Sequence, residues 1–132
     1  MVNTLRRAVA DTSVLIGVEA VRFDADFLRD YELGVSTVTI GELRLGVLQA
    51  GDPAIAARRL STFQLAQRFE PLAIDEAVAE AWALLVSQLR AASRKAPIND
   101  TWIAATAIAH KVPVVAQDAD YDHMPNLEVI RI

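Results

Sequence analysis

In the sequence LRRAVADTSVLI, residues 5–16, an apolar run ends at the carboxylate residue Asp11. Residues 5–10 end in a short apolar run, which predicts a first strand. The helix predicted after it carries Val14, Leu15 and Ile16, and the hydroxyl groups of residues 12–13 are expected to cap it. The carboxylate of Asp11 therefore lies where the strand ends and the helix begins.

The same alternation of strand and helix continues along the chain. Gly34 is expected to break the chain before a strand, and Thr39 and Glu42 have the spacing of a capping box that opens a helix. Asp75 is expected to cap a long helix with a basic end. The further strands are predicted at residues 35–38, 69–74, 112–116 and 127–132, and the further helices at residues 25–31, 39–49, 53–67, from 75, and 97–109. This order predicts a three-layer α/β/α sandwich around a mainly parallel sheet, formed as one domain by residues 1–132.

Composition excludes several classes of protein. The 132 residues are 53% hydrophobic and 23% charged, which is too apolar for a disordered chain. Cysteine is absent, which excludes a disulfide scaffold and a thiolate zinc site. That absence also fits a reducing cytosol, and we expect a cytoplasmic protein. No apolar run approaches the roughly 18 residues of a membrane span. The net charge of −4 argues against a general polyanion binder, unless bound divalent cations offset it.

Four carboxylates are predicted at one edge of the sheet. Asp11 ends the first strand, Glu42 and Asp100 lie in first turns of helices, and Asp118 follows a buried strand by two residues. Ligands bind at this edge in open α/β sheets. Clustered carboxylates repel one another unless they take up protons or hold a cation. Ligand sets made only of oxygen favour Mg²⁺ or Mn²⁺, so the pattern predicts a metal-dependent phosphoryl or phosphodiester site.

Each of these acids also has a purely structural interpretation. Asp11 could be a turn residue, Glu42 could complete the capping box, and Asp100 could offset the helix dipole. Asp118 and Asp120 belong to an acidic loop that could simply be solvated. A similar choice remains for three basic residues, which either contact RNA phosphates or close the long helix: Arg90, Arg94 and Lys95.

Four segments taken together resemble the PIN domain, and most closely the VapC toxins of bacterial VapBC toxin–antitoxin modules. They are VADTSVLI at 9–16, TIGELRLGV at 39–47, INDTWIAA at 98–105 and PVVAQDADY at 113–121. The resemblance implies a PIN-like fold and a Mg²⁺- or Mn²⁺-dependent endoribonuclease that acts as a toxin and inhibits translation and growth. It also implies a homodimer, an RNA substrate such as tRNA or rRNA, and a VapB antitoxin whose tail occupies the groove beside the acids.

The resemblance also assigns roles to the acids. Asp11 and Asp100 match the direct metal ligands, Glu42 and Asp118 complete the catalytic quartet, and Asp120 matches a further acid that sometimes assists. We expect Asp118 to be a metal ligand as well. Two positions depart from the family pattern, because Ala116 stands where Thr or Ser is common and Tyr121 replaces the commoner Phe.

Two other functions stay open. One is a catalytically inactive PIN-like module that binds RNA or protein. The other is a Mg²⁺-binding, phosphate-accepting domain of the receiver type. That class carries an acidic pair beside its first strand, whereas Asp11 here follows the apolar residues 8–10.

Overall fold

The structure is a computed structural model that describes residues 5–20 and 25–132. Strands and helices alternate as the sequence predicts, with a short 3₁₀ helix, η1, at Ala25–Asp30. The strands are β1 (Arg6–Ala10), β2 (Tyr31–Ser36), β3 (Glu70–Leu72), β4 (Val114–Ala116) and β5 (Val129–Arg131). The α-helices are α1 (Thr12–Glu19), α2 (Thr37–Leu48), α3 (Pro53–Ala66), α4 (Glu76–Ala91) and α5 (Ile98–His110).

The five strands form one sheet in the order β3-β2-β1-β4-β5, and every pairing is parallel. β1 lies at the centre, with Ala8 opposite Leu33 on β2 and Ala10 opposite Val115 on β4. All five carboxyl ends therefore meet at one edge, which is the arrangement on which the predicted site depends.

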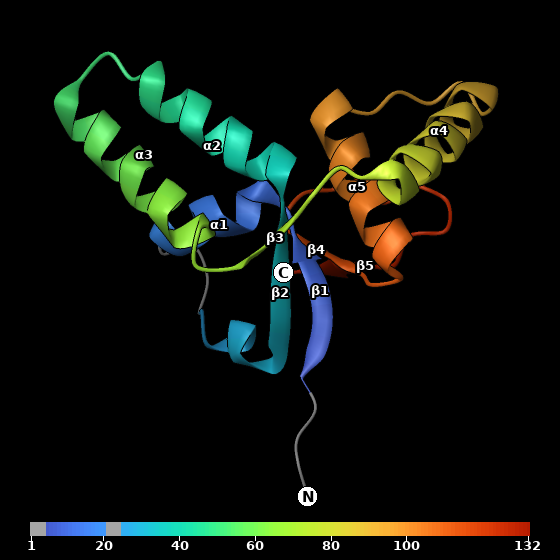
Figure 1. The fold of residues 1–132 in the computed structure, drawn as a ribbon, viewed down its shortest axis with the longest axis horizontal. Coiled ribbons are helices and arrows are strands. Elements are labelled where there is room, and N and C mark those ends of the chain that lie inside the picture. Colours follow the sequence, from blue (N-terminus) through green and yellow to red (C-terminus); the bar gives the residue numbers. More distant parts are fainter. Residues whose placement is uncertain (1–4, 21–24) are drawn as a thin grey trace, which may run out of the picture.

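Helices cover both faces of the sheet, which confirms the three-layer sandwich. Along β1, Val9 packs into the core cluster that contains residues of α4 and α5, whereas Ala8 and Ala10 pack with Val14 of α1. The alternation follows from the two-residue period of a strand. In Figure 1 the α2–α3 pair and the α4–α5 pair stand as two arms, and β1 and β2 run upward so that their carboxyl ends lie between them.

The boundary between β2 and α2 differs from the prediction. The strand covers Tyr31–Ser36 instead of 35–38, and the helix begins at Thr37 instead of Thr39. Ser36 is the cap, because its side chain accepts a hydrogen bond of 3.1 Å from the backbone N–H of Val38. The predicted capping box is therefore wrong, and Glu42 lies in the second turn of α2, where its side chain is not needed to cap the helix.

Gly34 lies inside β2, not at a break before it. A Cβ at this position would stand 2.5 Å from Cδ1 of Leu72, on the neighbouring strand β3. Glycine leaves room for that side chain, which would have to shift if this residue carried a Cβ. From the sequence alone, a glycine needed for close packing of two strands cannot be distinguished from a glycine that interrupts secondary structure.

The cap of α1 is also corrected. Asp11 itself is the N-cap, since its side chain accepts the backbone N–H of Ser13 at 3.1 Å. The hydroxyl groups of Thr12 and Ser13 make other contacts. Asp75 caps α4 as predicted, accepting the backbone N–H of Val78 at 3.0 Å.

Among the helices of the described residues, none combines the length and the apolar composition needed to cross a bilayer.

Candidate active site

The predicted acids occupy the carboxyl edge of the sheet and the helix starts beside it. Asp11 follows β1 and is only 4% exposed. Asp100 lies in the first turn of α5, and Asp118 and Asp120 lie in the loop that follows β4. Glu42 projects from α2, the helix that follows β2.

Three donors hold the buried carboxylate of Asp11. Its Oδ2 accepts the backbone N–H of Ser13 at 3.1 Å and the Ser13 hydroxyl at 2.5 Å. Its Oδ1 accepts the hydroxyl of Tyr121, also at 2.5 Å, and Tyr121 is fully buried. A carboxylate offers about four acceptor positions, so one position on Oδ1 is left for another partner.

The other acids of the loop and of α5 interact with Asp11 and with one another. Burial, the charge of Asp11 and a side-chain hydrogen bond with Asp120 raise the pKa of Asp100 from 3.8 to about 7. Burial also raises the pKa of Asp118, with a contribution from Asp11. Four carboxylates thus share one region, and their mutual repulsion makes this region attractive to a proton or a cation.

Glu42 belongs to a separate chain of hydrogen bonds. The Thr12 hydroxyl donates to Oε1 of Glu42 at 3.0 Å, and the hydroxyls of Thr12 and Thr39 are also 3.0 Å apart. A hydroxyl has one proton, so Thr39 must donate to Thr12 while Thr12 donates to Glu42. The Thr12 hydroxyl thus links Glu42 to the residue that follows Asp11.

The chemistry of the donors fits a hard divalent cation. All candidate ligands are carboxylate oxygens, which Mg²⁺ and Mn²⁺ prefer. Nevertheless, within residues 5–20 and 25–132 no three acidic or imidazole side chains are already placed to hold one ion together. Bringing such carboxylates together without a cation is costly, because two unit charges 4 Å apart repel by about 4 kcal/mol at an effective dielectric constant near 20. A small rearrangement of the carboxylates would have to accompany binding.

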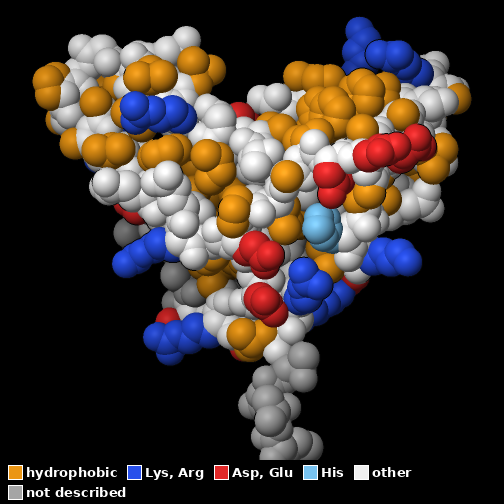
Figure 2. Space-filling view, in the orientation of Figure 1, with side chains coloured by type: hydrophobic (Ala, Val, Ile, Leu, Met, Phe, Trp, Pro, Cys, Tyr) orange, Lys and Arg blue, Asp and Glu red, His pale blue; other side chains and the backbone are white. Residues whose placement is uncertain are grey.

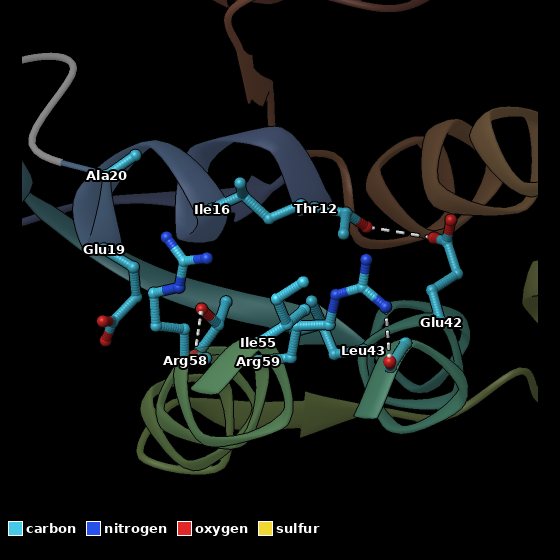
Figure 3. A pocket seen from close by; sticks show the side chains of 11 residues that line it. Thr12, Ile16, Glu19, Ala20, Glu42, Leu43, Ile55, Arg58 and Arg59 are labelled. Atoms are coloured by element: carbon cyan, nitrogen blue, oxygen red, sulfur yellow. Dashed lines mark hydrogen bonds between the residues drawn. The ribbon is translucent and has the colours of Figure 1, made fainter. Parts of the chain in front are cut away.

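A groove of about 710 Å³ leads away from Glu42 between α1, α2 and α3. Thr12 and Glu42 line one part of it, and Figure 3 shows Arg58 and Glu19 extending into the space between α3 and α1. Arg59 donates to the carbonyl oxygen of Gly46 at 2.8 Å. In Figure 2 the surface is also indented between the two helical arms, and apolar side chains cover much of each arm.

Comparisons with known proteins identify the family. The family model of the PIN domain matches residues 8–127. Ribonuclease VapC4 of Mycobacterium tuberculosis is 70% identical over 128 residues, which cover 97% of this chain and 98% of the relative. The chain belongs to the PIN domain family. Among PIN domain proteins it is also 38% identical to Ribonuclease VapC5 of the same organism, over the full length of both chains.

A solved structure supports the same placement. The chain superimposes with a TM-score of 0.84 on a chain in a crystal structure of VapBC-5, a member of the VapBC family of toxin–antitoxin systems from M. tuberculosis. The match covers 96% of this PIN domain chain and 98% of the other, at 37% identity. The predicted fold and the predicted family are therefore confirmed.

Sequence reasoning missed the hydroxyl groups that hold the acids of this PIN domain. Ser13 and Thr12 directly follow Asp11, Thr39 precedes Glu42 by three residues, and Tyr121 follows Asp118 by three. That proximity was the available signal, because hydroxyl donors commonly orient carboxylates that act as ligands.

Proposed function

We propose that the chain is a divalent-cation-dependent endoribonuclease and the toxin of a type II toxin–antitoxin pair, which cleaves RNA and so inhibits translation and growth. The observation that carries the proposal is the shared region of Asp11, Asp100, Asp118 and Asp120, where burial and neighbouring charges raise the pKa of Asp100 to about 7. The names of the relatives, Ribonuclease VapC4 and VapC5, support the same activity.

Mg²⁺ or Mn²⁺ is the proposed cation. Asp11, Asp100 and Asp118 are the proposed ligands, Asp11 through the open position on Oδ1. Glu42 is the fourth catalytic acid, held by the Thr12 hydroxyl at 3.0 Å. Asp120 assists through its charge, which acts on Asp100. A divalent cation supplies a nucleophilic water at neutral pH and stabilises charge on a phosphoryl group.

The residues of the chain then have distinct tasks in hydrolysis. Ser13 and Tyr121 keep the Asp11 carboxylate in one orientation, and Glu42 helps to place the attacking water opposite the leaving oxygen. In-line attack by water leaves a 5′-phosphate and a 3′-hydroxyl, so the RNA 2′-hydroxyl is not the nucleophile. Of the basic residues predicted to touch RNA, Arg94 and Lys95 line a pocket with Asp120. We propose that they contact the substrate, and that Arg90 closes α4 instead.

A VapB-type antitoxin is the proposed protein partner. The groove between α1, α2 and α3 has apolar lining from Ile16, Leu43 and Ile55, together with Arg58 and Arg59. This mixture suits an antitoxin segment with apolar and acidic side chains. Ile16→Glu should therefore weaken binding of the antitoxin without changing cleavage of RNA. We further propose that residues 1–132 form one domain, that two copies form a homodimer, and that the protein acts on tRNA or rRNA in the cytoplasm.

The direct test is cleavage of RNA with Mg²⁺, with Mn²⁺ and with EDTA, followed by mapping of the product ends. We expect cation-dependent cleavage with 5′-phosphate ends, and loss of cleavage in Asp100→Asn. Products with a 2′,3′-cyclic phosphate would contradict the mechanism.

A binding-only PIN module is the second candidate, favoured by the spacing of the acids noted above. Growth arrest that survives Asp100→Asn in cells would support this second function and contradict the nuclease.

A further inference from the structure

A second pocket, of about 260 Å³, adjoins the acids through Asp120. One side of it is apolar and buried, formed by Leu89 of α4 and by Met124. The other side is formed by exposed polar side chains. These side chains are Arg94 and Lys95, which follow α4, and His123, which lies in the loop after β4. We call this site the Arg94–His123 pocket.

Local hydrogen bonds fix both walls of the pocket. After α4, Ser93 adopts a left-handed conformation with φ of 54°, and the N–H of Arg94 donates to the carbonyl oxygen of Leu89 at 2.9 Å. This turn directs residues 94–95 toward the loop after β4. In that loop the N–H of Met124 donates to the carbonyl oxygen of Tyr121 at 3.1 Å. The pocket is therefore built by two ordered turns.

Among the described residues, none of the basic side chains of the pocket forms an ion pair with an acid. The ion pairs among the described residues are Arg6–Glu128, Arg29–Asp26 and Arg131–Asp122, and none of them includes Arg94, Lys95 or His123. The acid of the pocket, Asp120, is among the groups that raise the pKa of Asp100 and so belongs to the candidate active site. Unpaired cations next to an apolar surface match a nucleotide, which joins a phosphate to a flat base.

We propose that the Arg94–His123 pocket binds one nucleotide of the RNA, adjacent to the phosphodiester that is cleaved. Arg94 and Lys95 contact its phosphate, and the base lies against Leu89 and Met124 with the imidazole of His123 beside it. This inference rests on the proposed ribonuclease function and adds a substrate subsite to it.

The test measures binding of a short, fluorescently labelled single-stranded RNA to the full chain by anisotropy, in EDTA and over a series of salt concentrations. Each phosphate contact contributes about 0.7 to the slope of log K against log salt for a single strand. Arg94→Ala and Lys95→Ala should each lower the slope, by about 0.7 together for the one phosphate that they share. His123→Ala should weaken binding about fivefold or more and leave the slope unchanged.

Arg90→Ala is the matched control, because Arg90 is also an exposed cation near the end of α4 but does not line the pocket. It should leave the slope almost unchanged. Equal effects of Arg90→Ala and Arg94→Ala would overturn the proposal, since affinity would then come from diffuse charge. Far-UV circular dichroism and melting of each variant verify that it is folded.

Other outcomes separate this proposal from the proposed function. If the wild-type chain cleaves RNA with Mg²⁺ but Arg94→Ala, Lys95→Ala and His123→Ala bind as the wild type does, only the pocket is wrong. If it cleaves RNA but does not bind it in EDTA, the pocket is also wrong, because its contacts need no metal. If the wild type neither binds nor cleaves RNA, both proposals fail.

Discussion

The hydroxyl of Tyr121 donates a 2.5 Å hydrogen bond to Oδ1 of Asp11, and so joins two buried residues that lie 110 positions apart. Burial and the charge of Asp11 raise the pKa of Tyr121, so the hydroxyl remains a donor throughout the physiological range. The contact fixes the carboxylate that ends β1 to the loop that follows β4. It couples the geometry of the candidate active site to the packing of the core.

Tyr121→Phe should weaken both stability and cation binding, because the ring keeps its packing while Oδ1 of Asp11 loses its donor. A hydrogen bond to a charged group contributes about 1.5–3 kcal/mol, and loss of a residue that orients a ligand lowers metal affinity roughly 10–100-fold. Denaturant unfolding measures the first effect and calorimetry with Mn²⁺ the second. Tyr31→Phe is the matched control, since Tyr31 begins β2 at the opposite edge of the sheet. Equal Mn²⁺ affinities for both variants would contradict the role of Tyr121.

Asp100→Asn should make the metal-free protein more stable at neutral pH while it abolishes cleavage. The pKa of Asp100 is raised from 3.8 to about 7 in the folded state, so the folded chain binds more protons than the unfolded chain between these values. Stability from this group therefore falls as pH rises from about 4 to about 7. In EDTA at about pH 8 the variant should melt a few degrees higher than the wild type.

Melting curves in EDTA between about pH 4 and pH 8 test whether the stability contributed by Asp100 falls as the pH rises. The difference between wild type and Asp100→Asn should shrink as the pH is lowered toward 5. A variant that melts lower than the wild type at pH 8, with an unchanged dependence on pH, would show that Asp100 is not destabilised by its acidic neighbours.

Thr12→Val should impair cleavage through Glu42. The substitution keeps the shape of the side chain but removes the hydroxyl that donates to Glu42. We expect a loss in kcat of roughly ten- to a hundredfold, as for other small misplacements of a catalytic group. In the double variant with Glu42→Gln the two losses should not add, because both act on one contact. Thr62→Val, which removes a hydroxyl bonded to the Arg58 carbonyl oxygen, is the control and should retain activity.

Two glycine substitutions should have opposite effects on stability. At Gly34 the Cβ of alanine would stand 2.5 Å from Cδ1 of the buried Leu72, so Gly34→Ala should cost roughly 1–3 kcal/mol. At Gly41, in α2, no atom lies within 4 Å of the added Cβ. Gly41→Ala should therefore stabilise the helix by about 0.5–1 kcal/mol. Chemical denaturation measures both free energies of unfolding. A Gly34→Ala protein as stable as the wild type would contradict the close packing of β2 on β3.

The sequence was sufficient to predict the layers of the fold and the edge on which the acids lie. Buried strands such as residues 114–116 are continuously apolar, Asp11 and Asp118 follow strands, and Asp100 lies in the first turn of a helix, so local pattern and site coincide for these three acids. The features that the sequence could not predict depend on contacts between distant segments. Gly34 resembles a break until Leu72 is packed beside it, and Glu42 resembles a helix cap until Ser36 is seen in that role.

Side-chain partners were the least predictable part of the site. The hydroxyl of Tyr121 seemed a mild change from phenylalanine, because nothing in residues 113–121 indicates that this ring points back to Asp11. Likewise, Arg94 and His123 are separated by 28 intervening residues, and only the folded chain brings them to one pocket.

A crystal structure grown with Mn²⁺ and measured by anomalous scattering tests the central claim most directly. The account predicts an anomalous peak that contacts carboxylate oxygens of Asp11 and Asp100 at about 2.0–2.2 Å, with Asp118 nearby, and that disappears in Asp100→Asn. Crystals of the wild type with ample Mn²⁺ in which these carboxylates hold no peak would contradict it.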